Sequence, residues 1–143
     1  MLIILDTTLL WLLVHPRGGP ESLKLRQLLV PRLEMGDAIG VAEICDYEAR
    51  RELIRRGATK QIANLDALIN VSTYIALDTT TMREAAFLWA ELRRAGRPTA
   101  SQQALDGDVI LGAQAKRQGP HLVATENLQH LSRICNAVHW ESL

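Results

Sequence analysis

The sequence has no hydrophobic run long enough to cross a membrane. A membrane-spanning helix needs about 20 consecutive apolar residues, but Asp6 interrupts the first apolar stretch and only six more apolar residues follow at 9–14. A secretory signal is also not expected, because no basic segment comes first and no small-residue cleavage site follows. We therefore expect a cytoplasmic protein without a membrane segment.

Cysteine, net charge and aromatic residues are scarce as well. The two cysteines, Cys45 and Cys135, lie far apart without the spacing of a zinc site, which is typical of a reducing compartment. The formal net charge is zero, which excludes a polycation but not a local basic face. With an aromatic content of 4%, broad recognition of single strands by base stacking is not supported. Recognition of structured RNA by its shape remains open.

Short apolar runs alternate with helical patterns along the 143 residues, a length that suits one domain with one core. Strands are predicted at 2–5, 38–44, 71–77, 121–124 and 137–140. Helices are predicted at 9–14, 21–35, 47–56, 59 or 60 to 68, 81–94, 106–117 and 128–133, with a loop around Gly96, Pro98 and Ser101. The alternation predicts an α/β fold in which helices cover both faces of a mostly parallel, about five-stranded sheet.

The ends of the predicted helices follow from their capping residues and prolines. Thr7 or Thr8 is the expected N-cap of the first helix, and Asp46 is the expected N-cap of the helix that Gly57 ends. Pro31 should kink or split the second helix, because proline removes a backbone hydrogen bond and clashes with the preceding turn.

Acidic residues follow the ends of several predicted strands. In such a sheet, functional groups gather where the strands end and the chain turns into helices. Asp6 follows the first strand, Asp46 and Glu48 follow the second, and Asp108 begins the most apolar helix. Carboxylates that meet repel one another, and a hard divalent cation removes that cost. Because no His/Cys cluster accompanies these acids, Mg²⁺ or Mn²⁺ fits better than zinc.

Each of these acids also has a simpler interpretation as a helix N-cap. The segment LDTT occurs twice and separates the two interpretations. Asp78, in the second copy, lies in a turn before a helix that Thr81 can cap, with Glu84 at capping-box distance. Asp6, in the first copy, ends the most apolar strand, where an uncompensated charge is costly. Asp108 begins a helix predicted to be buried, so it also lacks a solvated surface.

Four segments in chain order resemble the motifs of the PIN-domain ribonucleases, especially the VapC-type toxins of toxin–antitoxin pairs. They are ILDTTLLWLL, VAEICDYEARREL, LDGDVILGAQA and VATENLQHLSRI. The resemblance implies a single three-layer, PIN-like nuclease domain over residues 1–143. It implies that the metal ligands are Asp6, Glu48 and Asp108, that Asn127 is a further catalytic residue, and that Thr7 and Thr125 support them.

The second motif leaves the identity of its acid open. Glu43, Asp46 and Glu48 all lie near the end of the predicted strand. Alignment on the apolar–basic run that follows favours Glu48, which we also expect in the first turn of its helix. Cys45 departs from the family, which often has serine or threonine at that position. Asp106 is a candidate for an additional metal-binding acid.

The resemblance implies an endoribonuclease that uses Mg²⁺ or Mn²⁺ to hydrolyse RNA phosphodiesters with metal-activated water. It also implies an antitoxin partner. The leucine-rich segments 8–14 and 21–35 are candidates for an antitoxin groove or a homodimer face. Arg50, Arg51 and Arg55 are candidates for RNA binding, although a solvated helix face explains such a cluster equally well.

Two other functions compete with this one. A non-catalytic, PIN-like binding module would keep the acids as helix caps and bind no metal among them. A receiver-type signalling domain would use Asp78 as its phosphoacceptor, but the sequence lacks the expected acidic pair after the first strand and the lysine after the fifth. The four histidines are scattered, and we assign them no role.

Overall fold

Strands and helices alternate in the computed structural model, which describes residues 1–98, 101 and 106–143. The strands are β1 (Leu2–Leu5), β2 (Ala38–Ala42), β3 (Thr73–Ile75), β4 (His121–Thr125) and β5 (Ala137–His139). The helices are α1 (Thr7–Val14), α2 (Pro20–Glu34), α3 (Glu43–Arg56), α4 (Thr59–Asn70), α5 (Thr79–Arg94), α6 (Gly107–Lys116), α7 (Leu128–Leu131) and the 3₁₀ helix η1 (Trp140–Ser142). Within and after the predicted loop, residues 99–100 and 102–105 lie outside the described residues.

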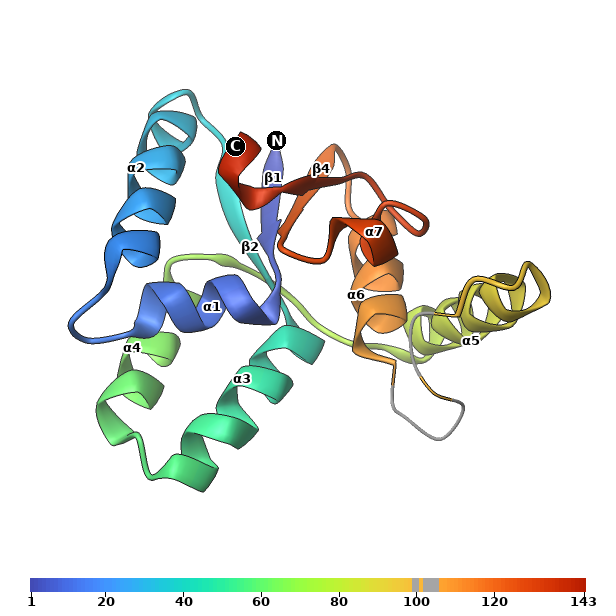
Figure 1. Ribbon diagram of the computed structural model, residues 1–143, viewed down its shortest axis with the longest axis horizontal. Helices are drawn as coiled ribbons and strands as arrows, with labels where there is room; N and C mark the ends of the chain where they lie inside the picture. The colour runs from blue at the N-terminus through green and yellow to red at the C-terminus, as the bar shows by residue number, and fades with distance from the viewer. Residues whose placement is uncertain (99–100, 102–105) are drawn as a thin grey trace.

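The strands form one sheet in the order β3-β2-β1-β4-β5. Every neighbouring pair is parallel, which confirms the predicted α/β fold. In Figure 1, α1, α2 and α4 lie on one side of the central strands and α6 lies on the other. α1 packs against α2, α3 and α4, and α6 packs against α3 and α5.

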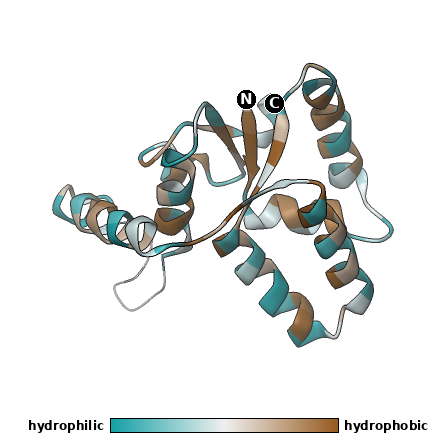
Figure 2. Cartoon of the chain, turned by 180° about the vertical axis from the view of Figure 1, so that it is seen from behind, coloured by the Kyte–Doolittle hydropathy of each residue, from teal (hydrophilic) through white to brown (hydrophobic). Residues whose placement is uncertain are grey.

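β1 occupies the centre of the sheet because its side chains are apolar on both faces. Ile3, Ile4 and Leu5 are fully buried, as expected for a parallel strand covered by helices on both sides. Figure 2 shows β1 as a continuous hydrophobic strand, whereas the helices mix hydrophobic and hydrophilic residues. Leu5 pairs with a residue of β2 on one side and of β4 on the other. The next residue, Asp6, therefore lies at the middle of the carboxyl edge of the sheet.

The predicted N-caps of two helices are wrong, because the aspartate of LDTT caps the helix in both copies. α1 begins at Thr7, and the Asp6 carboxylate accepts a hydrogen bond of 2.9 Å from the Leu9 backbone N–H. α5 begins two residues before its predicted start, and the Asp78 carboxylate accepts from the Thr81 N–H at 2.6 Å. Aspartate is a better N-cap than threonine, so the threonines are free to enter the first turn.

α3 begins at Glu43, four residues before its predicted start, and Asp46 is not its N-cap. No side chain of its own caps this helix. Instead, the buried Gln114 of α6 accepts a hydrogen bond of 3.3 Å from the Ile44 N–H and donates to the Ile75 carbonyl at the end of β3. A side chain 70 residues away in the sequence thus accepts the hydrogen bond that a local N-cap would accept. β2 therefore ends at Ala42, two residues before the end of the predicted strand.

The remaining boundaries differ from the predictions in smaller ways. α2 continues through Pro31 as one helix, so the predicted split is wrong. β3 has three residues and is shorter than the predicted strand. Gly57 ends α3 as predicted, with a left-handed φ of 66°. Among the described residues, no helix combines the length and apolar character needed to cross a membrane.

Candidate active site

Three carboxylates from distant parts of the chain gather at the carboxyl edge of β1. Asp6 directly follows β1, Glu48 lies in α3, and Asp108 lies in the first turn of α6. Burial raises the pKa of Glu48, and the charges of Asp108 and Asp6 raise it further. The same three charges act on the Cys45 thiol, whose pKa is raised mainly by burial. The structure thus brings together the three acids that the sequence predicted as metal ligands.

Asp6 is both a helix cap and a member of this cluster. One carboxylate oxygen accepts from the Leu9 N–H, and the other accepts from the Glu126 N–H at 3.2 Å. Burial raises the pKa of Asp6, although hydrogen bonds from Thr125 and these two N–H groups oppose the rise. Asp6 forms no ion pair within the described chain. Its charge is therefore buried without a basic partner.

Glu48 is held between Thr7 and Gly107. The Thr7 hydroxyl donates to Glu48 Oε1 at 3.0 Å. A Cβ atom at position 107 would lie 2.9 Å from both carboxylate oxygens of Glu48, which is too close for a real contact. Only glycine at this position leaves room for the carboxylate at the start of α6, beside Asp108.

Asp108 is held by two residues that follow β4. Its Oδ2 accepts from Asn127 Nδ2 at 3.1 Å and lies 3.1 Å from His130 Nδ1. Thr125 links this group to Asp6, because its hydroxyl oxygen accepts from the Asn127 N–H at 2.8 Å and also hydrogen bonds to the Asp6 carboxylate. The predicted residues from the fourth motif therefore connect two of the acids.

His130 belongs to the site although the sequence analysis gave it no role. Besides its contact with Asp108, its Nδ1 lies 2.8 Å from Asn127 Nδ2. The available signal was its position three residues after Asn127, one helical turn along α7. The spacing was not used in the sequence analysis, because the four histidines are distributed along the sequence without a common motif.

The structure separates the three acids that compete for the second motif. Glu43 accepts a hydrogen bond from the Leu77 N–H and anchors the chain after β3. Asp46 accepts from the Tyr74 hydroxyl at 3.0 Å, away from β1. Glu48 is the one of the three that lies with Asp6 and Asp108. It accepts a hydrogen bond from Thr7, which follows Asp6, and the charges of both aspartates raise its pKa. Its predicted place in the first helical turn is wrong, because α3 begins five residues before it.

Asp106 serves as the N-cap of α6. Its carboxylate accepts from the Val109 N–H at 3.2 Å, and the residue is only 7% exposed. Burial is the main cause of the raised pKa of Asp108, and the charge of Asp106 adds to it. Asp106 therefore strengthens the negative potential of the site while capping its helix.

Of the three arginines predicted to bind RNA, Arg51 is the one whose charge acts on the site. Arg50 is held between two aspartates, one on α3 and one on α4. Arg55 forms an ion pair of 2.6 Å with Glu52. Arg51 is exposed, lies 5.1 Å from the centre of a tyrosine ring on its own helix, and lowers the pKa of Glu48 against the effect of burial.

The donor set suits Mg²⁺ or Mn²⁺ in its chemistry. Within residues 1–98, 101 and 106–143, no three His, Cys, Asp or Glu side chains are arranged to hold a metal ion by themselves. Mg²⁺ does not require such a cage, since one or two carboxylates usually hold it while waters complete its octahedral shell. Asp6 and Glu48, which form no ion pair in the described chain, supply such oxygens, and Asp108 lies beside them.

Glu48→Gln is expected to stabilise the fold near neutral pH. The pKa of Glu48 in the folded state lies above its ordinary value of 4.5. As the pH rises, Glu48 therefore ionises in the unfolded chain at a lower pH than in the folded protein, which favours the unfolded chain. The resulting destabilisation begins near pH 4.5 and is complete above the folded-state pKa. Glutamine cannot ionise, so thermal melts in EDTA should give equal Tm values in acid and a higher Tm for the variant near neutral pH.

Glu52→Gln on the same helix provides a control of opposite sign. Hydrogen bonds from Arg55 and Arg56 lower the pKa of Glu52 to about 2. Its charge therefore stabilises the fold above the ordinary pKa of 4.5 and loses that effect as the pH falls. This variant should melt at or below the wild-type Tm near neutral pH. A Tm of Glu48→Gln below that of the wild type near neutral pH would contradict the prediction that the negative charge of the buried Glu48 destabilises the fold.

The sheet and its helices form an α/β fold that is shared with chains of solved VapBC and FitAcB structures. The structure of VapBC2 from Rickettsia felis bound to a promoter DNA fragment aligns with a TM-score of 0.72 and 15% identity, covering 98% of this chain and 99% of that chain. DNA-bound VapBC from Salmonella typhimurium aligns with a TM-score of 0.70 and 21% identity, covering 98% and 99%. FitAcB from Neisseria gonorrhoeae aligns with a TM-score of 0.67 and 15% identity, covering 99% of each chain.

The sequence itself matches no protein-family model and no curated protein. At identities of 15% to 21%, the structural likeness establishes the fold that the motifs suggested. Activity, metal and partners have to be argued from the residues of this chain.

Proposed function

We propose that the protein is a divalent-metal-dependent endoribonuclease and the toxin of a toxin–antitoxin pair. The observation that supports this most is the meeting of Asp6, Glu48 and Asp108 at one edge of the sheet. Burial raises the pKa of all three carboxyl groups. A fold tolerates such a concentration of buried acid where a function requires it.

In this proposal the acids hold Mg²⁺ or Mn²⁺, and the neighbouring residues fix their orientation. When bound, the ion would activate water and neutralise negative charge on the scissile phosphodiester. Thr7 orients Glu48, and Thr125 orients Asp6. Asn127 and His130 orient Asp108. Such supporting contacts typically change metal affinity or activity by about 10–100-fold.

Cleavage of RNA with and without metal tests the proposal. Purified protein should cleave single-stranded or structured RNA in Mg²⁺ or Mn²⁺, and excess EDTA should abolish the cleavage. Adding Mg²⁺ beyond the chelator should restore it. Cleavage that persists in EDTA would contradict a metal-dependent mechanism, and the absence of cleavage in both metals, across RNAs of both kinds, would contradict the nuclease proposal.

A non-catalytic binding module is the second candidate. It is favoured by the capping roles of Asp6 and Asp106, which explain two of the acids without any metal. Titration of the protein with Mn²⁺, followed by the electron paramagnetic resonance of the free ion, distinguishes the two. A nuclease site should bind Mn²⁺ and should lose it when Asp108 is replaced by asparagine. A binding module should leave the signal of free Mn²⁺ unchanged.

We further propose that an antitoxin covers an apolar surface formed mainly by α2. The solved proteins of similar fold are VapBC and FitAcB assemblies. On this chain, Leu23, Val30 and Leu33 of α2 are exposed by 58%, 50% and 41%. Three exposed apolar side chains on one helix indicate an interaction surface more than a single one would. A hollow of about 520 Å³ between α1, α2 and α4 adjoins two of them. A homodimer through the same leucines is the alternative occupant of this surface.

A further inference from the structure

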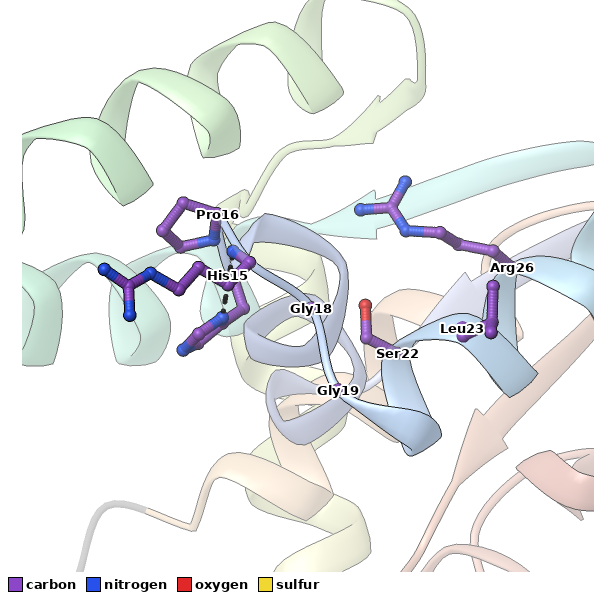
Figure 3. A pocket seen from close by; sticks show the side chains of 8 residues that line it. His15, Pro16, Gly18, Gly19, Ser22, Leu23 and Arg26 are labelled. Carbon is purple, nitrogen blue, oxygen red and sulfur yellow. Dashed lines mark hydrogen bonds between the residues drawn. The ribbon is translucent and has the colours of Figure 1, made fainter.

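Another hollow, lined by several polar and basic side chains, lies at the turn between α1 and α2, at the far end of α1 from Asp6. Its volume is about 420 Å³. Its lining includes His15, Arg17, Gly18, Gly19, Ser22 and Arg26. Figure 3 shows that Ser22 and Arg26 come from α2 and that His15 and the two glycines come from the turn facing them. The proposed metal site uses none of these residues.

Ser22 is a buried polar residue of this hollow whose hydroxyl lacks a hydrogen-bond partner. Its side chain is only 2% exposed, and its hydroxyl has no hydrogen-bond partner. A buried hydroxyl without a partner costs free energy, so such a group is normally satisfied. Gly18, with a φ of +59°, lies beside it, and a Cβ there would be 3.4 Å from the hydroxyl oxygen. The glycine keeps this approach to Ser22 free of a side chain.

The N-terminus of α2 opens into the same hollow. Its N-cap, Gly19, has no side chain to cap the helix. The first backbone bond is donated by the Leu23 N–H to the Gly19 carbonyl at 2.9 Å. The N–H groups of Glu21 and Ser22 precede this bond and have no side-chain cap. Free N–H groups and the helix dipole together favour an anion at such an end.

The charges around the hollow are mainly positive. Arg17 and Arg26 form no ion pair with a carboxylate in the described part of the chain. Arg26 is fixed in place, because its Nη2 donates to the Leu13 carbonyl at 2.6 Å. His15 Nδ1 accepts from the Arg17 N–H at 3.3 Å, which closes the turn. Glu21 is the acid of the first helical turn. It is exposed and lines a neighbouring hollow along α1 rather than this one.

An adjoining hollow extends from this turn along α1 toward the end of the helix that Asp6 caps. It has a volume of about 620 Å³, shares Gly18, Gly19 and Ser22 with the first hollow, and extends along α1 past Trp11 to Thr8. Trp11 is 37% exposed, so part of its ring is available for stacking. α1 has eight residues, and at 1.5 Å per residue its two ends lie about 12 Å apart. A short stretch of extended nucleic acid can span that distance.

We propose that the α1–α2 turn binds a backbone phosphate of the RNA substrate, away from the bond that is cut, while Trp11 stacks on a base between the two sites. The inference rests on the proposed function in taking RNA as the ligand. Ser22 and the free N–H groups of α2 donate to the phosphate oxygens, and Arg17 supplies positive charge. A carboxylate ligand from a protein partner would leave the hollow along α1 and the exposed part of Trp11 unexplained.

The test measures binding of a short single-stranded RNA in EDTA, where metal-dependent cleavage cannot occur. Ser22→Ala and Arg17→Ala should each bind about tenfold more weakly, since a hydrogen bond to a charged group is typically worth at least that factor. For Arg17→Ala, the slope of log affinity against log salt should fall by roughly 0.7, the value for one phosphate contact on a single strand. Neither variant should lower the Tm, because Arg17 is exposed and Ser22→Ala removes an unpaired hydroxyl.

Arg83→Ala is the matched control, because it removes one exposed positive charge from α5. Its affinity and salt slope should equal those of the wild type. Equal affinity and slope in Ser22→Ala and Arg17→Ala would overturn the inference and leave the nuclease proposal standing. Inorganic phosphate is the second probe: shifts of the Gly19 and Ser22 amide resonances without any effect of the variants on RNA binding would overturn the assignment to RNA. Weakened RNA binding without cleavage in any metal would count against the nuclease proposal alone.

Discussion

Replacing Asp6 with asparagine is expected to abolish metal-dependent RNA cleavage, whereas the same replacement at Asp78 should leave it intact. Both aspartates belong to the segment LDTT, and both cap a helix. Asparagine caps helices about as well as aspartate, so both variants should fold. The activity of Asp6→Asn should fall by at least about 100-fold, because the loss of residues that merely support a metal ligand already costs 10–100-fold.

The environments of the two aspartates explain the difference. Burial raises the pKa of Asp6, which has no basic partner in the described chain. The hydrogen bond from the Thr81 N–H lowers the pKa of Asp78, which is exposed and lies 3.8 Å from Arg117. The charge of Asp78 is therefore fully explained by its cap and its neighbour. The charge of Asp6 is not, and we assign it to metal binding.

Cleavage rates in Mg²⁺ and the affinity for Mn²⁺ should be measured for both variants beside their Tm values. Loss of cleavage in both variants would mean that the assay responds to helix capping rather than to the metal site. Wild-type cleavage by a folded Asp6→Asn protein would exclude Asp6 as a metal ligand. Equal Tm values would show that a loss of cleavage does not result from unfolding of the variant.

Replacing Gly107 with alanine should reduce cleavage strongly without destabilising the fold. The added Cβ would lie 2.9 Å from both oxygens of Glu48, so the carboxylate has to shift from its place at the start of α6. A misplacement of about 1 Å in a catalytic site can cost of the order of 100-fold in rate. The fold should tolerate the change, because the clash is with the end of a flexible side chain.

Gly119→Ala is the matched control, because a Cβ at that position meets no atom within 4 Å. It should keep both wild-type cleavage and wild-type Mn²⁺ affinity. Gly107→Ala should lose affinity for Mn²⁺ together with activity and keep the wild-type Tm. Full activity in this variant would show that the position of Glu48 beside α6 is not needed for catalysis.

The order of strands and helices could be predicted from the sequence because it depends on local patterns. The unbroken apolar run at 2–5 predicts a buried parallel strand, and β1 is that strand at the centre of the sheet. The boundaries were less predictable where a distant residue intervenes. α3 begins at Glu43 because Gln114 of α6 accepts from the backbone of its first turn, and no local pattern contains that contact.

Asp6 and Asp108 were predictable as members of the candidate site, because Asp6 follows a strand and Asp108 lies at the start of a helix, and the family resemblance added Glu48. Which acid of the second motif joins them was decided by contacts, since Glu43 turns toward the chain after β3 and Glu48 toward Thr7. The role of Gly107 was not visible in the sequence, and that of His130 was indicated only by its spacing of three residues from Asn127. The glycine directly before Asp108 has no visible role in the sequence, because the Glu48 carboxylate that occupies the space beside it comes from another helix.

By itself, then, the sequence determined the alternation of strands and helices and the presence of acids after several strands, because apolar periodicity and capping act over a few residues. Only the tertiary structure decided which of these acids share one space. Hydrogen bonds and steric contacts between α3, α6 and the segment after β4 depend on how the elements pack, and packing brings together residues that lie far apart along the chain.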